Sequence, residues 1–113
     1  MAKQPAQKKK VQLNIANIHV LSQLTAAHKA TMACARLGLT VLHVRLDGSV
    51  PTLEVQHNAL TQKWLDTDKA FVYSHMHDAT EQLISTAQRM LASCRIIFFI
   101  STFRNNSLMR AYG

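Results

Sequence analysis

Histidine is the residue type in this chain best suited to chemistry, because neutral imidazole is the commonest metal ligand in proteins and titrates near neutral pH. The chain contains six: His19, His28, His43, His57, His75 and His77. His75 and His77 would share one face of a strand, whereas His43 and His57 lie near opposite ends of a predicted hairpin. Compact zinc sites need Cys and His pairs at fixed spacings, and the sequence has none. We therefore expect no metal, no cofactor, and histidines that lie on the surface or on a helix face.

Catalytic patterns are also missing from the sequence. There is no G-x-S-x-G, no H-E-x-x-H and no glycine-rich phosphate loop, and the whole chain has only 3 glycines. Asp66 and Asp68 flank a threonine in a polar stretch, which is more typical of a turn than of a pair of catalytic carboxylates. Cys34 and Cys94 are too few and too far apart for a disulfide framework, so we expect two buried, unreactive thiols. The sequence predicts a protein that is not an enzyme.

Composition and charge set the remaining limits. The chain has 113 residues, 48% of them hydrophobic, which is typical of one globular domain. An aromatic content of 6% argues against a base-stacking platform built from rows of rings. The net charge is +7, and part of it comes from Lys3, Lys8, Lys9 and Lys10. Such a basic arm either binds nucleic acid or is a solvated tail, and both alternatives stay open. The longest apolar run, residues 96–100, is too short for a membrane span, so we expect a cytoplasmic protein.

The elements that would position any site begin with a long helix over residues 17–37. Asn17 is a plausible N-cap and Gly38 is the expected C′ residue that ends the helix. Several alanines supply helix propensity. One apolar stripe recurs at helical spacing: Ile18, Leu21, Leu24, His28, Met32 and Ala35.

A hairpin is predicted directly after this helix. Residues 39–46 and 52–56 alternate in polarity around Asp47-Gly48, a strong hairpin signal. Leu53 and Val55 would face the core, and the intervening polar residues would face away. Pro51 cannot donate a ladder hydrogen bond, so the second strand is either an edge strand or begins after it.

The second half of the chain has weaker signals. Residues 60–65 could form a short helix and residues 71–73 a strand. Asp78 followed three residues later by Glu81 resembles a capping box, and the apolar residues after it recur at helical spacing. These residues are Leu83, Ile84, Ala87, Met90 and Leu91. Residues 95–100 form a continuous apolar run that predicts a strand buried on both faces, central in the sheet.

Together these patterns predict an α+β fold. A long N-terminal helix would pack on a small antiparallel sheet, with a second helix before the last strand. Residues 1–12 would be a basic flexible arm, residues 13–100 a single domain, and residues 101–113 a loose tail. A small sheet with an open edge tends to pair with a copy of itself, so we also expect a homo-oligomer.

The candidate contact residues follow from the hairpin. Pairing along its second strand would let Thr52, Glu54 and Gln56 provide specificity towards a partner protein. Trp64, beside charged neighbours, is a candidate interface anchor, whereas Phe71 is expected in the core. In the alternative function the protein binds nucleic acid through Lys3 and Lys8–Lys10, with further cations on the folded part. Those further cations are Lys29, Arg36 and Arg45.

Residues 18–56 and 92–99 resemble small regulatory proteins of temperate phages and prophages: damage-induced antirepressors, Ash-like proteins and inhibitors of cell division. Their shared layout is an Ala-rich helix, a small-residue break, a strand, a tight turn and a return strand after proline. Matching segments here are Ala26–Leu37, Gly38, Thr40–Val44, Asp47-Gly48 and Pro51–Gln56. Cys94-Arg95-Ile96 resembles their C-terminal strand.

This resemblance implies a non-catalytic adaptor, most specifically an antirepressor that binds a phage repressor and removes it from its operator. An inhibitor of a host defence or cell-division factor is the alternative within the same class. A protein that imitated DNA would be acidic, whereas this chain is basic. An antirepressor with this charge is therefore expected to bind the repressor protein itself.

Overall fold

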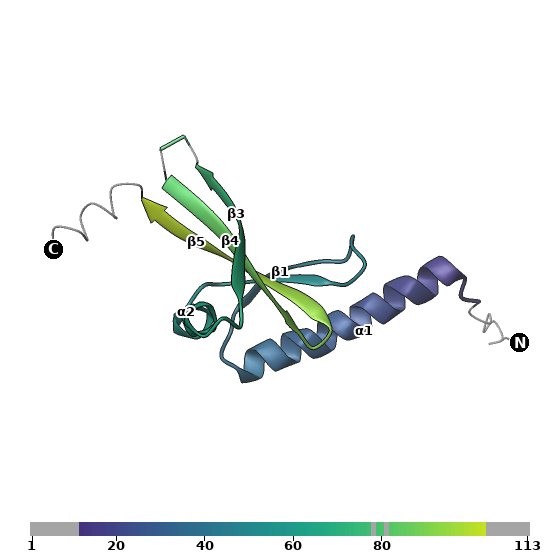
Figure 1. Ribbon diagram of the computed structural model, residues 1–113. Helices are drawn as coiled ribbons and strands as arrows, with labels where there is room; N and C mark the ends of the chain where they lie inside the picture. Colours follow the sequence, from purple (N-terminus) through teal and green to yellow (C-terminus); the bar gives the residue numbers. More distant parts are fainter. Residues whose placement is uncertain (1–11, 78, 81, 104–113) are drawn as a thin grey trace, which may run out of the picture.

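The computed structural model describes residues 12–77, 79–80 and 82–103 (Figure 1). Two helices and five strands follow in the order α1 (Ile15–Arg36), β1 (Val41–Arg45), β2 (Thr52–Val55), α2 (Ala59–Asp66), β3 (Phe71–His77), β4 (Gln82–Leu91) and β5 (Cys94–Phe103). The predicted α+β class is confirmed.

All five strands belong to one sheet, in the order β1-β2-β5-β4-β3. Neighbouring strands are antiparallel except β2 and β5, which are parallel. The sheet is therefore mixed, and the prediction of an antiparallel sheet is wrong at this pair. The reason is topological: α2, β3 and β4 lie between β2 and β5 in the chain, and this long connection lets β5 return beside β2 in the same direction.

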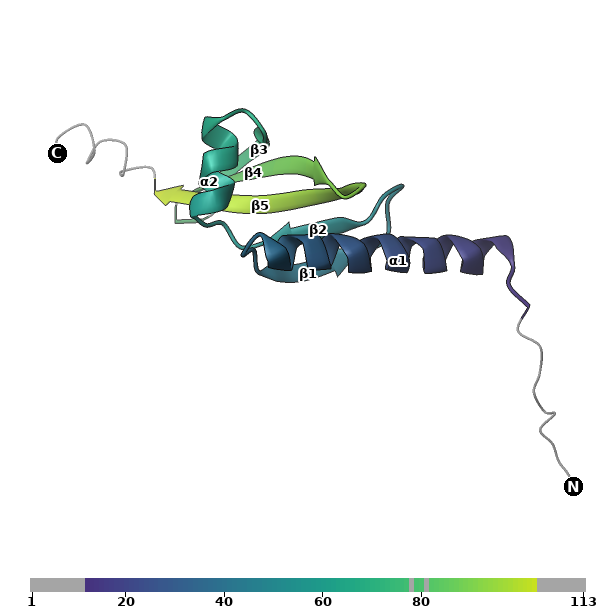
Figure 2. The same ribbon diagram turned by 90° about the horizontal axis from the view of Figure 1, so that it is seen from below.

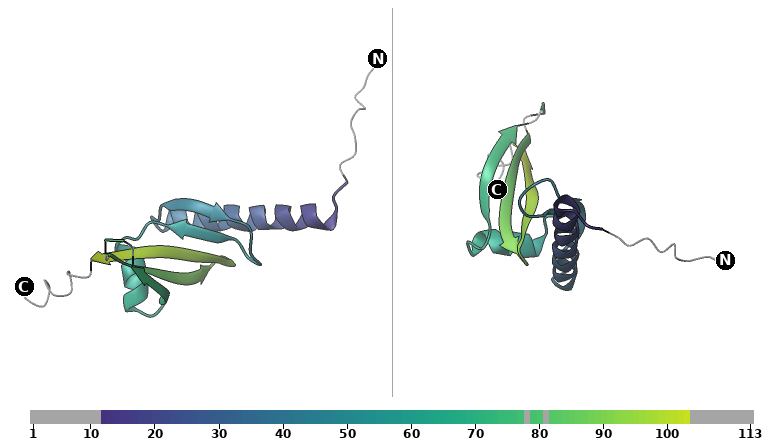
Figure 3. Two further views of the ribbon diagram at one scale, coloured as in Figure 1. Left: turned by 90° about the horizontal axis from the view of Figure 1, so that it is seen from above. Right: turned by 90° about the vertical axis from the view of Figure 1, so that its right-hand side faces the viewer.

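Both helices lie on the same face of the sheet (Figure 2). The core forms between them and the strands, and its strand side chains all come from this face, including Leu53, Ile96 and Phe98. α1 contributes small residues to the core: Ala27, Ala30 and Cys34. Neither of the two described helices lies on the other face of the sheet (Figure 3, left).

Local hydrogen bonds fix both ends of α1. The Asn14 side chain accepts a bond from the Asn17 amide at 2.8 Å, so Asn14 is the N-cap and the predicted cap at Asn17 is wrong by about one turn. Gly38 has a φ of +82°, which favours glycine, and it ends the helix as predicted. The Gly38 and Leu39 amides donate to Ala35 and Cys34 carbonyls at 3.0 and 2.9 Å, a Schellman motif.

The predicted hairpin is present, but its connection is longer than a tight turn at Asp47-Gly48. Arg45 pairs with Thr52, so residues 46–51 form the loop. β2 begins just after Pro51, whose carbonyl accepts a bond from the Arg95 amide at 2.9 Å. This position suits proline, since it needs an acceptor and no donor.

A second helix before the last strand is present as α2, but the helical stripe predicted from Leu83 to Leu91 is wrong, because this segment is strand β4. It lies between β3 and β5 and pairs along both, from Gln82 to Leu91 with β5. Two flanking partners satisfy its backbone on both sides, and this tertiary pairing overrides a helical apolar spacing. Ala92 and Ser93 form the turn into β5 with φ values of +53° and +64°, typical of a two-residue type I′ hairpin.

The short helix predicted at residues 60–65 is confirmed as α2, which a capping box at Asn58 and Thr61 begins. The strand predicted at residues 71–73 is confirmed and extends further, as β3. β5 lies in the middle of the sheet, as predicted, and it continues to Phe103, past the expected start of the tail at residue 101. Asp78 and Glu81 of the predicted capping box lie outside the described residues; Ala79 and Thr80 form a turn.

Candidate functional site

The predicted apolar stripe of α1 faces away from the sheet. We call Ile18, Leu21, Leu24, His28, Met32 and Ala35 the outer stripe. Leu21 and Leu24 are each 48% exposed, and Met32 is 44% exposed. The side of α1 that packs on the sheet carries Gln23, Ala27, Ala30 and Cys34 instead, about half a helical turn around the axis. The large apolar residues of the predicted stripe are therefore not the ones through which α1 packs on the sheet.

Small residues explain this orientation. Ala30 and Cys34 are 0% exposed and allow the α1 backbone to approach the strands closely. Cys94 of β5 reaches α1 directly, with its thiol donating to the Ala26 carbonyl at 3.5 Å. Both sides of α1 are therefore apolar, and the side with smaller residues is the one that packs.

The N-terminal end of α1 extends past the sheet (Figure 2). Every residue from 12 to 22 is exposed, and Ile15 is 86% exposed. A short helical segment with no tertiary packing is only marginally stable in water. A partner that covered Leu13, Ile18 and Leu21 would stabilise this segment as well as bury apolar surface.

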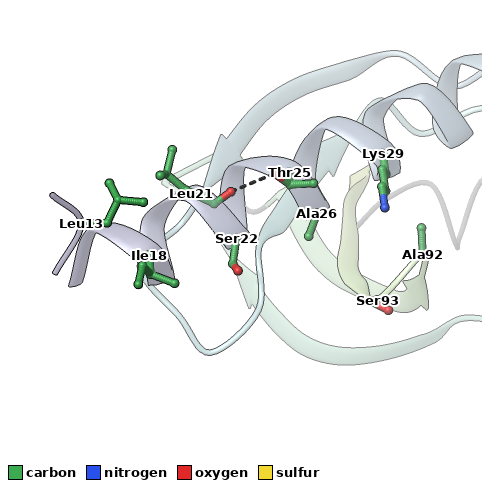
Figure 4. Close-up of a pocket in the computed structure, with 9 residues that line it drawn as sticks. All are labelled: Leu13, Ile18, Leu21, Ser22, Thr25, Ala26, Lys29, Ala92 and Ser93. Carbon is green, nitrogen blue, oxygen red and sulfur yellow. Dashed lines mark hydrogen bonds between the residues drawn. The ribbon is translucent and has the colours of Figure 1, made fainter. Parts of the chain in front are cut away.

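A groove of about 520 Å³ lies between this part of α1 and the β4–β5 turn (Figure 4). Its floor and walls include Ile18, Ser22 and Lys29 from the helix and Ala92 and Ser93 from the turn. A second groove of about 510 Å³ shares Lys29 and Ala92 with the first and includes His28, Met32 and Arg36. The outer stripe is thus bordered by two hollows that can accept side chains of a partner.

The charge beside the outer stripe is positive. Lys29 and Arg36 are both exposed, and α1 contains no Asp or Glu. An apolar stripe bordered by cations is complementary to an apolar surface bordered by carboxylates.

The predicted contact residues of β2 lie on an interior strand. β2 is paired with β1 on one side and with β5 on the other, so a partner cannot pair with its main chain. Thr52 and Glu54 are half-buried on the face without helices, and Gln56 is exposed just after the strand. The proposed edge pairing through β2 is wrong, because Pro51 precedes the strand rather than marking an edge; the edges are β1 and β3.

Trp64 is 4% exposed and is a core residue rather than an exposed anchor. Its ring meets the Phe98 ring edge-on with 6.4 Å between centroids, and the Arg89 guanidinium lies 4.5 Å from the Trp64 ring centroid. Phe98 also stacks on His57 at 5.5 Å. Phe71, which was expected in the core, is 57% exposed. The two aromatic assignments are thus reversed, because α2 turns Trp64 towards β5 while Phe71 lies on the face without helices.

The cations proposed for nucleic-acid binding are separated in space. Lys29 and Arg36 lie on α1, whereas Arg45 lies on the sheet face without helices. Lys3, Lys8, Lys9 and Lys10 lie outside the described residues.

His75 and His77 share a face of β3, as predicted, opposite Ser85 and Leu83. The His75 Nδ1 atom lies 2.9 Å from the Ser85 hydroxyl, and the His57 Nδ1 atom lies 2.6 Å from the Thr61 hydroxyl. Within the described part of the chain, no three His, Cys, Asp or Glu side chains come together as a metal site would require.

The two thiols are buried, as predicted. Burial raises the pKa of Cys34, to which the nearby Cys94 adds, and burial likewise raises the pKa of Cys94. A thiol with a raised pKa is a poor nucleophile at neutral pH.

None of the described helices combines the length and hydropathy needed to cross a membrane. Comparisons with protein-family models, curated proteins and solved structures found no match to this chain.

Proposed function

We propose that this protein acts by binding another protein through the outer stripe of α1, without catalysis, and that its partner is a phage repressor, which it inactivates as an antirepressor. The observation that carries this proposal is the solvent exposure of Leu21 and Leu24, which lie outside the packed side of α1. The choice of a repressor rests on the resemblance to phage regulatory proteins.

The apolar surface available there is large enough to matter. Full burial of a Leu or Met side chain stabilises by about 1.5–3 kcal/mol, so covering one that is half exposed contributes about 1 kcal/mol. Ile18, Leu21, Leu24 and Met32 together offer about 4 kcal/mol before the entropic cost of association. The bordering grooves add contacts for the partner's own side chains.

The cations beside the outer stripe limit the kind of partner surface that can bind there. Lys29 and Arg36 favour an apolar stripe with Asp or Glu along its margin, such as an amphipathic acidic helix. A repressor bound in this way would lose the oligomeric arrangement that it needs to bind its operator. We place this action in the bacterial cytoplasm, with the edge strands β1 and β3 available for pairing between copies of the chain.

The test compares substitutions on the outer stripe with a control substitution on β1, at side chains of equal solvent exposure. Leu21→Asp with Leu24→Asp places charge on the outer stripe, and Leu42→Asp places charge on β1, where the side chain is also 48% exposed. Each variant is expressed in a lysogen whose repressor controls a reporter gene, and repressor captured by the tagged protein is quantified after nuclease treatment and a high-salt wash.

We expect the wild-type protein and Leu42→Asp to derepress the reporter gene to similar levels. Both should also capture similar amounts of repressor. The double variant is expected to do neither, while keeping its circular dichroism spectrum. If the wild-type protein captures a different protein that the double variant does not, the repressor is not the partner. Equal activity of the double variant would overturn the outer stripe as the site.

A further inference from the structure

The sheet face without helices carries a distinct set of side chains. Side chains alternate between the two faces of each strand, so the partners of Ile97 share its face. Ile97 pairs with Gln88 of β4 and Glu54 of β2, and Gln88 pairs with Phe71 of β3. We call this face the open face. Its other members include Arg45, Thr52, Arg95, Met90, Phe99, Thr86, Ile84, Ser101 and Met76.

Aromatic rings gather on and beside this face. Phe71 is 57% exposed and Phe99 is 40% exposed, although both belong to regular strands. Tyr73 is 50% exposed at the irregular pairing between Val72 and Ser74. These are three of the chain's seven Phe, Tyr and Trp residues. The low aromatic content argues against rows of rings, yet the register of β3, β4 and β5 brings Phe71 and Phe99 to one face, with Tyr73 at the bulge in β3.

Cations lie at one end of the open face. Arg45 pairs with Thr52, and Thr52 pairs with Arg95, so the two arginines are two strands apart, about 10 Å. Both are exposed, as is His43, which pairs with Glu54. Glu54 is the single carboxylate among the described residues of this face, so its charge is net positive. Along β5, Ile97 lies between Arg95 and Phe99, and its partner on β4 is the uncharged polar residue Gln88, which also pairs with Phe71.

We infer that the open face binds single-stranded nucleic acid. Unpaired bases stack on Phe71, Tyr73 and Phe99, and the strand continues across the sheet so that phosphates beyond these bases contact Arg95 and Arg45. The spacing fits, because Phe71 and Tyr73 lie about 7 Å apart along β3, close to the separation of bases in an extended strand. A duplex is disfavoured, since rings on a sheet cannot reach the faces of bases that are already stacked.

Charge complementarity favours a nucleic acid over a second copy of the chain as the occupant of the open face. Two open faces packed together would bring arginines towards arginines, with one glutamate on each to offset them. A polyphosphate backbone supplies the missing negative charge, and its bases supply flat apolar surface for the rings. This site is separate from the outer stripe, which lies on the helix side of the sheet.

The probe for the test is a short fluorescein-labelled oligothymidylate, followed by fluorescence anisotropy with the full chain. Phe71→Ala and Phe99→Ala remove rings that are already exposed, so the fold should survive, which a thermal melt checks. Arg95→Ala removes one charge from the open face, and Lys63→Ala on α2 removes one charge elsewhere as its matched control. A chain lacking residues 2–10 separates the open face from the basic arm.

We expect each ring substitution to weaken binding about tenfold, because stacking on an aromatic ring contributes strongly for each base. Arg95→Ala should weaken binding and reduce its salt dependence, while Lys63→Ala should change neither. The chain lacking residues 2–10 should bind the oligonucleotide more weakly than the full chain. Replacing Phe71 should lower its affinity by the same factor as in the full chain. An unlabelled duplex should compete poorly with the labelled single strand.

Three results would overturn the inference. The first is an equal affinity of the ring variants and the wild type for the oligonucleotide, which would assign binding to the basic arm instead. The second is a duplex that competes as well as the single strand. The third is a change in sedimentation of Phe71→Ala with unchanged oligonucleotide affinity, which would make the open face an interface between copies of the chain.

Discussion

Exchanging the size of residues on the two sides of α1 tests its orientation most directly. Ala30 is 0% exposed on the packed side, and Leu24 is 48% exposed on the outer stripe. The sequence pattern alone predicts that Leu24 is a core residue and that Ala30 only supplies helix propensity. The structure predicts the reverse, so Ala30→Leu should damage the fold and Leu24→Ala should not.

The magnitudes follow from burial. Ala30→Leu adds three carbon atoms where α1 lies directly against the sheet, and such overpacking costs about 1–3 kcal/mol. Leu24→Ala removes a side chain that is only half covered, so the cost is at most about 1 kcal/mol, against 2–5 kcal/mol for a fully buried leucine. In a domain of this size, each kcal/mol lowers Tm by about 4 °C. The expected loss is therefore about 4–12 °C for Ala30→Leu and under about 4 °C for Leu24→Ala.

The measurement is a thermal melt followed by circular dichroism, with urea titration as a second method. Several protein concentrations are needed, because association through the outer stripe would make Tm depend on concentration and would exaggerate the effect of Leu24→Ala. A larger loss for Leu24→Ala than for Ala30→Leu at the lowest concentration would refute the orientation of α1, and with it the proposed binding site.

Two further predictions concern the core. Val55 is 1% exposed, so Val55→Arg should leave no soluble folded protein, and a soluble variant with an unchanged melt would show that β2 does not face the helices. Burial raises the pKa of Cys34 and Cys94 above the ordinary value of 9.0, which favours the protonated thiol in the folded state. Their contribution to stability is therefore present below pH 9.0 and lost as pH rises through the folded pKa, so the urea midpoint should fall between pH 8 and pH 10. Replacing both cysteines with alanine should flatten this pH dependence, and a wild-type midpoint as flat as that of the variant would contradict the burial effect.

The sequence predicted those elements whose signals are local. Gly38 ends α1 as predicted because its positive φ suits glycine, and the short helix predicted at residues 60–65 forms as α2. The buried run over residues 95–100 predicted the central strand because a strand flanked by others must be apolar over most of its length. None of these predictions required knowledge of distant contacts.

The predictions that failed depended on distant partners. Residues 82–91 have apolar residues at a spacing that both a helix and a strand can accommodate, and pairing with β3 and β5 decides between them. Trp64 looked like a surface anchor because its sequence neighbours are charged, yet α2 turns it towards Phe98. Gln23 lies on no apolar stripe, but it is 5% exposed and donates to the Ser49 carbonyl at 2.9 Å, which ties α1 to the hairpin loop.

The orientation of α1 was not predicted, although a cue for it was present in the sequence. Alanines at positions 27 and 30, followed by Cys34, repeat at helical spacing just as the leucines do. A helix with two apolar sides has two possible docking modes, and hydrophobicity alone ranks the larger side chains first. Close approach to a sheet favours the smaller ones instead, because their backbone can come nearer and gain contacts with several strands at once.

This arrangement has a consequence for function. Since α1 docks through small residues, its large residues are left on the outer side of the helix layer, while Phe71 and Phe99 lie on the opposite side of the sheet. The two surfaces share no residue and are separated by the core between α1 and β5. Substitutions on one should therefore act independently of substitutions on the other. The two proposals together therefore predict that a protein bound on the helix side and a nucleic-acid strand bound on the sheet side do not compete with each other.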